Sequence, residues 1–412
     1  MKKGSDILML GLARGDDDFG STAWSLAQAI AQEQTVYYIE PPQTWRDSLT
    51  RFNSPRYQLR RNARKKGRKH LLKAFDDQSP NLKVLVPPIM VPIQFLPPGK
   101  LYNHLLQLNR QRFNLWLQHQ ISLHNIKASA WINVFNPFYD PPLPGIQKVY
   151  YCTDRMEEAG YLRKHGPLLE QQVMRSSDLV LNTSKILLEH SQLSGARRAE
   201  VLRNAADYLL FAKAVSLTGP QPKAMQEKGA EVNLVYIGSI DSRIDTELVA
   251  QICRQRPNWQ LWWIGPIKKD AVAPLLEVAQ CHFLGSLPQR ELGEWLRYAD
   301  CGIIPFLCNA YTQAIYPLKV HEYLASGVGV VSTPFSQDML HFPPHTLHAE
   351  TADEWVLSIE KLIAQNQQDQ KRIRSAFASQ HSWQIRANEF FSLLPELAPT
   401  PIQDPKKKRL SA

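Results

Sequence analysis

The sequence predicts an α/β protein made of two Rossmann-like, doubly wound domains whose parallel sheets face each other across a cleft. Short apolar segments alternate with segments of helical periodicity in both halves of the chain, which is typical of parallel sheets with right-handed crossovers. A polar segment with Gly and Pro, residues 216–231, reads as a linker between the halves. The length of 412 residues suits two domains.

The first expected domain covers residues 1–212. Its pattern predicts strands at residues 6–13, 35–39, 82–86, 129–134, 148–152 and 178–182. It predicts helices at residues 21–32, 101–119, 168–175 and 185–192. Residues 87–98 are apolar, but their prolines exclude a helix or a central strand. This loop either packs over its own domain or contacts a membrane surface.

The second expected domain covers residues 213–382. Its pattern predicts strands at residues 232–237, 259–264, 282–284, 301–305 and 328–332. It predicts helices at residues 247–256, 289–298, 352–365 and 370–379, and a last helix at 383–394. In two joined units of this kind, ligands bind at the carboxyl ends of the strands.

The composition is that of a folded, soluble protein, with 44% hydrophobic and 21% charged residues. No apolar run reaches the roughly 18 residues that a membrane-spanning helix needs. The N-terminus begins like a signal peptide, but its apolar run is short and ends in Arg14, so we interpret it as a first strand. The five cysteines include no CxxC pair, which indicates neither a disulfide framework nor a zinc site and fits a reducing cytoplasm.

Positive charge is concentrated in one segment. Residues 51–73 contain ten Lys or Arg and no acidic residue, which matches the whole net charge of +10. Such a segment can meet nucleic acid, an anionic bilayer or a lipid-linked diphosphate, or it can be a solvated or mobile loop. Because no nucleic-acid-binding motif accompanies it, we favour a membrane or lipid-diphosphate partner over nucleic acid. The basic tail, residues 397–412, is expected to be disordered.

The most informative motif is YPLKVHEYLASGVGVVSTP, residues 316–334. It predicts a helix that opens at Pro317 and stops at Gly327, followed at once by a buried strand. A helix N-terminus suits a phosphate, and Lys319 adds a full positive charge beside it. Glu322 can accept hydrogen bonds from ribose hydroxyls. The motif therefore predicts a nucleoside-diphosphate site, with an ordinary, solvated αβ connection as the alternative.

Motifs in both halves resemble a known family in their order and spacing. The second half contains VNLVYIGSIDSRIDTELVAQICRQRPNWQLWWIGP, LGSLPQRELGEWLRYADCGIIPF and PLKVHEYLASGVGVVSTP, and the first contains VYYIEPP, VYYCTD, SSDLVLNTSKILLEHSQ and EVLRNAAD. Together they resemble GT-B glycosyltransferases of the retaining family four, particularly bacterial members that build cell-surface polysaccharides such as teichuronic acid. The resemblance covers nearly the whole chain.

This resemblance implies an activity. The expected reaction is transfer of a sugar from a nucleotide-diphosphate sugar to a saccharide or lipid-linked saccharide acceptor. Neither a metal nor another cofactor is expected, because fixed cations and helix dipoles stabilise the leaving diphosphate in this architecture. From the cysteines and the basic segment, rather than from the resemblance, the protein is expected in the cytoplasm, with peripheral association at the inner face of the membrane through residues 51–73.

The resemblance also implies roles for individual residues. Arg243 and Lys319 correspond to the cations that neutralise the leaving diphosphate, and Glu322 to the ribose-binding glutamate. Asp154 either orients the acceptor hydroxyl or has a structural role. The loop of residues 15–20 either approaches the donor phosphates or is a surface turn. The donor-binding set is completed by Gly238, Ser239, Gly265, Pro266, Leu287, Tyr316, Pro317, Leu318, Gly15 and Gly20.

One position departs from the family pattern. Family-four enzymes carry a second glutamate eight residues before the ribose-binding one, and here that position is Ala314. Sugar contacts are then expected from backbone around residues 313–316. A non-catalytic GT-B protein that binds a nucleotide sugar or a polysaccharide-synthesis partner is the alternative function. Residues 383–396 resemble the C-terminal helix that crosses back to the first domain.

Overall fold

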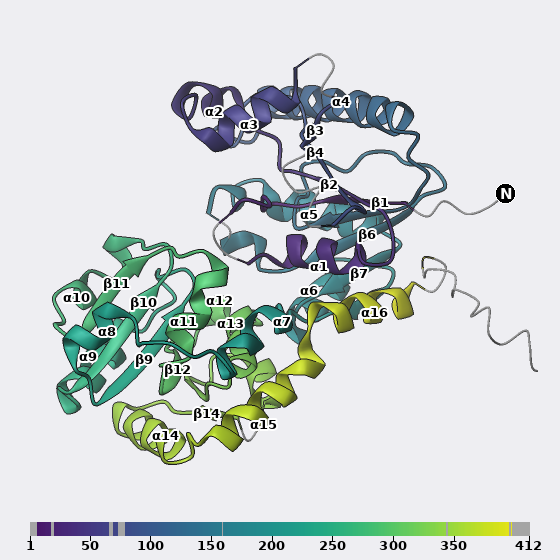
Figure 1. The fold of residues 1–412 in the computed structure, drawn as a ribbon. Coiled ribbons are helices and arrows are strands. Elements are labelled where there is room, and N and C mark those ends of the chain that lie inside the picture. Colours follow the sequence, from purple (N-terminus) through teal and green to yellow (C-terminus); the bar gives the residue numbers. More distant parts are fainter. Residues whose placement is uncertain are drawn as a thin grey trace, which may run out of the picture.

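The protein contains two α/β domains, each built on a central parallel sheet (Figure 1). The computed structural model describes residues 6–17, 20–65, 69–72, 79–158, 160–342, 345–394 and 397. Side chains of β1 alternate between two cores: Ile7 and Met9 pack on one face of the sheet, and Leu8 and Leu10 on the other. Helices therefore cover both faces of the first sheet.

Within the described residues, the first sheet has eight strands in the order β3-β4-β2-β1-β5-β6-β7-β8. Every neighbouring pair is parallel except β3 with β4. The strands are β1 Asp6–Leu10, β2 Val36–Ile39, β3 Leu71–Leu72, β4 Leu82–Leu85, β5 Ala128–Val134, β6 Gln147–Cys152, β7 Leu179–Asn182 and β8 Ala199–Val201. The sequence pattern did not predict β3 and β8, which are too short to show periodicity. The strand predicted at residues 6–13 ends at Leu10, because the chain then turns over Tyr38, whose hydroxyl donates to the Ala13 carbonyl.

The four predicted helices of this domain are present, as α1 Thr22–Ile30, α4 Lys100–Leu123, α5 Gly166–Ser176 and α6 Lys185–Leu193. The pattern did not predict α2 Trp45–Thr50 and α3 Pro55–Ala63, nor the short α7 Tyr208–Phe211 and α8 Lys223–Lys228 that follow. Phe211 of α7 and Met225 of α8 belong to the core of the second domain. The helix α4 is longer than predicted, and α8 lies in the segment interpreted as linker. Residues 66–68 and 73–78, which include part of the basic segment, lie outside the described residues.

The proline-rich loop, residues 87–98, packs over its own domain. Met90 and Ile93 are buried in two clusters that also contain α4 side chains. Phe95 is the exception, because 71% of its surface is exposed. Of the two interpretations of this loop, packing over the domain applies to most of its length.

The second sheet has six strands within the described residues, all parallel, in the order β11-β10-β9-β12-β13-β14. They are β9 Val232–Ile237, β10 Trp259–Ile264, β11 Cys281–Gly285, β12 Cys301–Ile304, β13 Val330–Ser332 and β14 Thr346–His348. The helices are α9 Thr246–Gln255, α10 Ala273–Leu276, α11 Leu292–Leu296, α12 Ala310–Gln313, α13 Leu318–Ala325, α14 Ala352–Ala364, α15 Gln368–Ala378 and α16 Trp383–Leu393. The helix predicted at residues 289–298 is confined to α11.

The helix α16 returns to the first domain (Figure 1). Its side chains Trp383 and Phe390 belong to the same core cluster as Leu26 of α1. A β-bridge between Ala206 and Ser382 marks where the chain crosses between domains. Leu397 is also buried in this cluster, while residues 398–412, the predicted disordered tail, lie outside the described residues.

Candidate functional site

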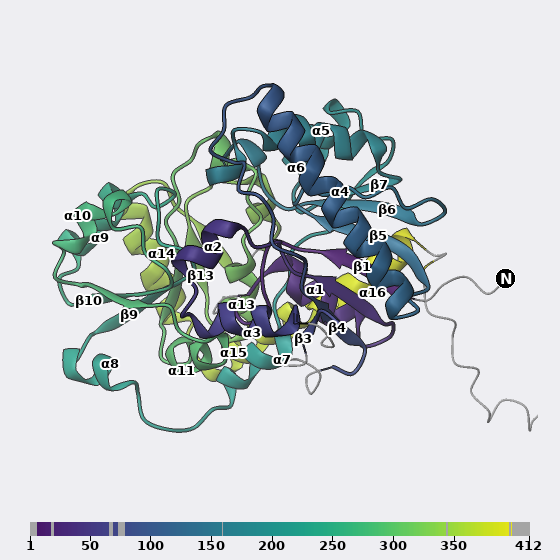
Figure 2. The ribbon, with the colours of Figure 1, turned by 90° about the horizontal axis from the view of Figure 1, so that it is seen from above.

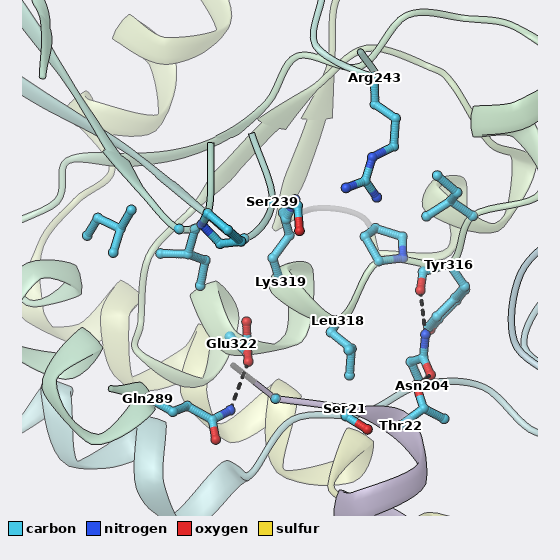
Figure 3. A pocket seen from close by; sticks show the side chains of 18 of the residues that line it. Ser21, Thr22, Asn204, Ser239, Arg243, Gln289, Tyr316, Leu318, Lys319 and Glu322 are labelled. Carbon is cyan, nitrogen blue, oxygen red and sulfur yellow. Dashed lines mark hydrogen bonds between the residues drawn. The ribbon is translucent and has the colours of Figure 1, made fainter. Parts of the chain in front are cut away.

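A cavity of about 470 Å³ lies between the two domains, at the carboxyl ends of the strands (Figure 3). It is lined by 13 of the 14 predicted site residues: Asp154, Gly20, Gly238, Ser239, Arg243, Gly265, Pro266, Leu287, Tyr316, Pro317, Leu318, Lys319 and Glu322. Gly15 does not line it. The structure thus brings the sequence-predicted residues of both domains to one site.

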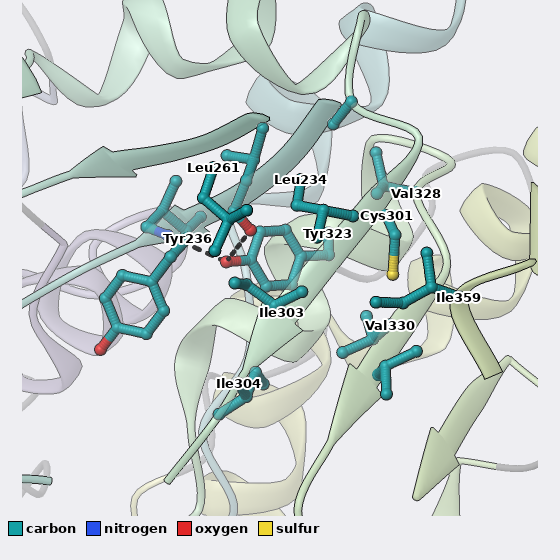
Figure 4. Packing of buried hydrophobic residues seen from close by; sticks show 14 of the residues in the cluster. Leu234, Tyr236, Leu261, Cys301, Ile303, Ile304, Tyr323, Val328, Val330 and Ile359 are labelled. Atoms are coloured by element: carbon teal, nitrogen blue, oxygen red, sulfur yellow. Dashed lines mark hydrogen bonds between the residues drawn. The ribbon is translucent and has the colours of Figure 1, made fainter. Parts of the chain in front are cut away.

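The helix α13, which carries Lys319 and Glu322, is fixed to the sheet by Tyr323 (Figure 4). The buried Tyr323 hydroxyl accepts a hydrogen bond from the Ile237 amide and donates one to the Val235 carbonyl, at the end of β9. Its ring lies against Gly302 of β12, where an added Cβ would be 2.7 Å from the ring. Both functional side chains therefore start from a rigid helix.

Lys319 is buried in the cavity wall and points at an aromatic pair. Its ammonium donates to the Tyr236 hydroxyl at 2.8 Å and lies 4.7 Å from the centre of the Phe306 ring. Burial, and then the nearby charge of Arg243, hold the pKa of Lys319 well below its usual range. A bound anion would reverse this effect by favouring the charged form of the lysine.

Arg243 is the second cation of the cavity, and Asp241 holds it in place. The guanidinium donates to both carboxylate oxygens of Asp241, each at 2.8 Å, and lies 5.3 Å from the centre of the Phe306 ring. A bidentate pair of this kind fixes the orientation of the guanidinium as well as its charge. Arg243 and Lys319 therefore form a preorganised site for an anionic group.

Glu322 lies one helical turn after Lys319 and receives a hydrogen bond from Gln289 Nε2 at 3.2 Å (Figure 3). Burial raises the pKa of Glu322 to about 7. Gly20 of the first domain meets this pair, because an added Cβ there would be 2.8 Å from Gln289 Nε2. The loop before α1 thus closes one side of the cavity against the second domain.

Glycine turns form the far end of the cavity. Gly238 follows β9 and Gly265 follows β10, with φ values of 112° and 149° that favour glycine. A Cβ on Gly265 would lie 2.1 Å from the Gly238 carbonyl oxygen, so the turns pack with no room for a side chain. Backbone groups, together with the side chain of Leu287, form the cavity wall here.

Asn204 connects the two domains at the cavity and was not predicted. Its side-chain amide donates to the Tyr316 carbonyl at 2.7 Å, and its side-chain oxygen accepts from Thr22 Oγ1 at 2.7 Å (Figure 3). The motif EVLRNAAD contains Asn204, but neither periodicity nor charge distinguishes it from its neighbours. The other lining residues that sequence reasoning missed are Ser21, Thr22, Phe135, Thr153, Ile237, Ile264, Ser286, Gln289, Leu292, Phe306 and Ile315.

Asp154 lies on the first-domain side of the cavity. Burial raises its pKa to about 6, while Oδ1 accepts a hydrogen bond from the Arg155 amide at 2.8 Å. The charge of Arg243, across the cavity, favours the ionised form. Both roles considered for Asp154 are compatible with this position, because one oxygen bonds the backbone and the residue still lines the cavity.

The loop containing Gly15 is held away from the cavity by the basic segment. Arg60 of α3 is fully buried and donates to Asp16 at 2.5 and 2.7 Å and to Glu40 at 2.6 and 2.7 Å. Asp16 is therefore paired within its own domain, and its carboxylate is neutralised by Arg60. Asp18 lies outside the described residues.

Ala314, the departure from the family pattern, does not line the cavity. It is fully buried in a cluster of first-domain side chains that includes Tyr150, Cys152 and Leu187. A glutamate at this position would bury a charge among apolar groups. The small alanine side chain instead packs against the first domain.

The part of the chain that the structure describes contains neither a candidate metal site nor a candidate membrane-spanning helix. In that part of the chain, no cluster of three or more His, Cys, Asp or Glu side chains is placed to hold a metal ion. The described helices include none with the length and hydrophobicity needed to cross a bilayer.

Sequence comparison finds a family match in the second domain. Residues 231–365 match the family "Glycosyl transferases group 1", which is about a third of the chain. The chain is also 24% identical over 256 residues to the putative teichuronic acid biosynthesis glycosyltransferase TuaH of Bacillus subtilis strain 168. That match covers 58% of this chain and 64% of TuaH, slightly less than two thirds of the relative.

Solved structures with this fold are GT-B glycosyltransferases. Sucrose-phosphate synthase from Thermosynechococcus elongatus has a TM-score of 0.65 at 14% identity, covering 95% of this chain and 99% of its own. HepE from Anabaena, in complex with UDP and glucose, has a TM-score of 0.63 at 12% identity. The match covers 95% of this chain and 100% of the HepE chain. Trehalose-6-phosphate synthase from Burkholderia multivorans has a TM-score of 0.66 at 10% identity, and the match covers 96% of this chain and 99% of that structure's chain. The predicted GT-B fold is confirmed, and the family match of residues 231–365 agrees with the resemblance in the second domain.

Proposed function

We propose that the protein transfers a sugar from a nucleotide-diphosphate sugar to a saccharide or lipid-linked saccharide during synthesis of a cell-surface polysaccharide. The observation that carries this proposal is the presence of Lys319, Arg243 and Glu322 on one interdomain cavity. TuaH, whose name refers to teichuronic acid, supports the polysaccharide role, and the UDP bound to HepE supports a nucleotide donor.

The proposed donor position follows from the cavity's chemistry. The diphosphate lies at the N-terminus of α13, between Lys319 and Arg243, where charge and backbone amides are both favourable. The ribose hydroxyls donate to Glu322, which is one turn further along the helix. The base then occupies the end formed by the turns at Gly238 and Gly265.

The proposed reaction breaks the bond between the anomeric carbon and the donor phosphate oxygen and forms one to the acceptor oxygen. Negative charge develops on the leaving diphosphate, and the two cations stabilise it by several kcal/mol without a metal. The acceptor oxygen attacks the face of the sugar from which the diphosphate leaves, so the anomeric configuration is retained. The acceptor proton passes to the leaving phosphate on that face. Asp154 orients the acceptor hydroxyl from the first-domain side.

Two measurements test this function. Thermal-shift screening against nucleotide sugars should identify the donor, because a ligand that binds only the folded state raises Tm. That donor should then release nucleoside diphosphate with the wild-type protein and much less with Glu322→Ala. Tm stabilisation without any release, with or without saccharide acceptors, would instead indicate the non-catalytic nucleotide-sugar-binding protein.

A further inference from the structure

The outer layer of the first domain has surface features that the cavity does not use. The helices α2, α3 and α4 form this layer, at the top of Figure 1 and facing the viewer in Figure 2. Residues 41–125, which contain these helices, include 15 Lys or Arg and three acidic residues. The resulting charge of +12 exceeds the +10 of the whole chain, so the remainder of the chain is slightly acidic.

The helix α2 has no buried residue, although it carries large apolar side chains. Trp45 is 54% exposed and Leu49 is 85% exposed, and Phe52 follows just after the helix with nearly half of its surface in solvent. The spacing of four residues places Trp45 and Leu49 on one side of α2. The guanidinium of Arg61, on α3, lies 5.0 Å from the centre of the Phe52 ring.

The helix α4 adds an apolar stripe to the same layer. It contains no acidic residue in 24 positions. Leu101, Leu108 and Leu115 repeat every seven residues and are all exposed, while Phe113 and Leu117 on the inner side are fully buried. The seven-residue spacing returns to nearly the same direction after two turns, so the three leucines form one line on the outer surface.

We propose that this layer, defined by Trp45, Leu49, Phe52, Leu101, Leu108 and Leu115 with its surrounding arginines, docks on an anionic lipid bilayer. Apolar side chains gain free energy by entering the interface, tryptophan is favoured there, and arginines attract anionic head groups. Nucleic acid would be attracted by the same charge but would gain little from exposed leucines. Positive charge together with exposed apolar side chains therefore favours the bilayer over nucleic acid.

This surface differs from the basic segment that the sequence indicated. Arg60 is fully buried in ion pairs and contributes no charge to the outer layer. The apolar contribution comes from α2 and α4, which lie outside residues 51–73 for most of their length. Bilayer docking therefore depends on helices that the charge count alone did not identify.

The docking surface is joined to the cavity through α3. Arg60 binds Asp16, and Arg56 lies 4.0 Å from Asp17, in the loop that leads to Gly20 on the cavity wall. Docking would therefore hold the first-domain wall of the cavity close to the lipid surface. Delivery of a lipid-linked acceptor there rests on the proposed function, but bilayer binding itself does not.

Co-sedimentation of the full chain with phosphatidylcholine vesicles, with and without phosphatidylglycerol, tests the proposal. Binding is expected only with phosphatidylglycerol and should weaken at high salt. The variant Arg51→Gln/Arg61→Gln should bind less, by about fivefold for each arginine. Leu49→Ser/Phe52→Ser should bind about tenfold less while keeping the fold, because both side chains are exposed. The control Leu193→Ser/Leu357→Ser, at exposed leucines elsewhere, should bind like the wild type.

Other results would overturn the proposal. The proposal is wrong if the wild-type protein stays in solution with anionic vesicles at low salt. It is also wrong if Leu49→Ser/Phe52→Ser binds the vesicles as well as the wild type does. Binding to a duplex oligonucleotide without vesicle binding would assign the layer to nucleic acid. Lipid-free dimerisation that Leu49→Ser abolishes would assign it to a second copy of the chain. Because sedimentation needs no donor, its outcome is independent of the transfer assay.

Discussion

The Lys319 ammonium donates a hydrogen bond to the Tyr236 hydroxyl at 2.8 Å and lies 4.0 Å from the centre of the same ring. Tyr236 in turn donates to the Ser239 carbonyl, so the lysine is held at the turn after β9. The ring supplies a favourable cation–π contact but no negative charge. Burial, and then the charge of Arg243, therefore hold the pKa of this lysine well below its usual range.

Donor binding is expected to be coupled to proton uptake at Lys319. A diphosphate beside the ammonium raises its pKa, so the lysine takes up a proton as the nucleotide sugar binds at mildly alkaline pH, above the pKa of about 7 of Glu322, where that carboxyl is already ionised and releases no proton. Calorimetric titrations in two buffers of different ionisation enthalpy measure this uptake. Lys319→Met should abolish it and reduce transfer by about 100- to 1000-fold. Heats of wild-type binding that do not depend on the buffer would contradict the expectation.

Glu322 is expected to reduce stability at high pH. Its folded pKa of about 7 lies above the ordinary 4.5, so the folded state binds more protons between these values. Stability should fall as pH rises from about 4.5 to 7, and Glu322→Gln should remove a penalty of about 1–3 kcal/mol at pH 8. The same substitution should leave stability at about pH 4 nearly unchanged. Unfolding by urea at both pH values checks this, and equal effects at both would contradict it.

Ionised Glu322 is also expected to be the form that binds the donor. Only the carboxylate accepts hydrogen bonds from two ribose hydroxyls, so donor affinity should rise with pH through about 7. The pH dependence of donor Kd, measured with a nucleotide sugar that does not itself titrate near neutral pH, tests this. Glu322→Gln should bind more weakly and should lose the dependence that is centred near 7.

The buried Arg60 is expected to be a stability determinant of the first domain. Arg60→Met leaves the carboxylates of Glu40 and Asp16 without their partner and should cost about 3–5 kcal/mol. Arg60→Met/Glu40→Leu should recover part of this loss, because no charge then remains unpaired at the fully buried position. Denaturant unfolding measures both, with the exposed Arg46→Met as the control that changes stability by less than about 0.5 kcal/mol.

Asn204 is expected to position the donor motif for catalysis. Asn204→Leu removes the hydrogen bonds to Tyr316 and Thr22 and should lower kcat/KM by about 5- to 100-fold. Thr22→Val, which removes one of the two, should have a smaller effect. Steady-state kinetics alongside Tm separates positioning from global destabilisation. A loss of Tm with unchanged kcat/KM at low temperature would show that Asn204 is only structural, and the exposed Asn258→Leu is the matched control.

Much of this site follows from local sequence. Pro317 and Gly327 delimit the helix α13, and the fixed spacing on that helix places Lys319 and Glu322 one turn apart. The glycines after β9 and β10 are required where strands end in tight turns, so they also could be read from the sequence. The sequence pattern did not predict short elements such as β3, because they contain too few residues to show a periodicity.

The sequence by itself determined most of the strands and helices, the parallel sheets and the residues at their carboxyl ends, because hydrophobic periodicity and turn chemistry are local properties. Only the tertiary structure decided which distant residues meet. It joined Asn204 to Tyr316, buried Ala314 against the first domain, and removed Arg60 from the basic surface by pairing it with Glu40 and Asp16. Such pairings depend on domain packing and burial, which no local pattern encodes.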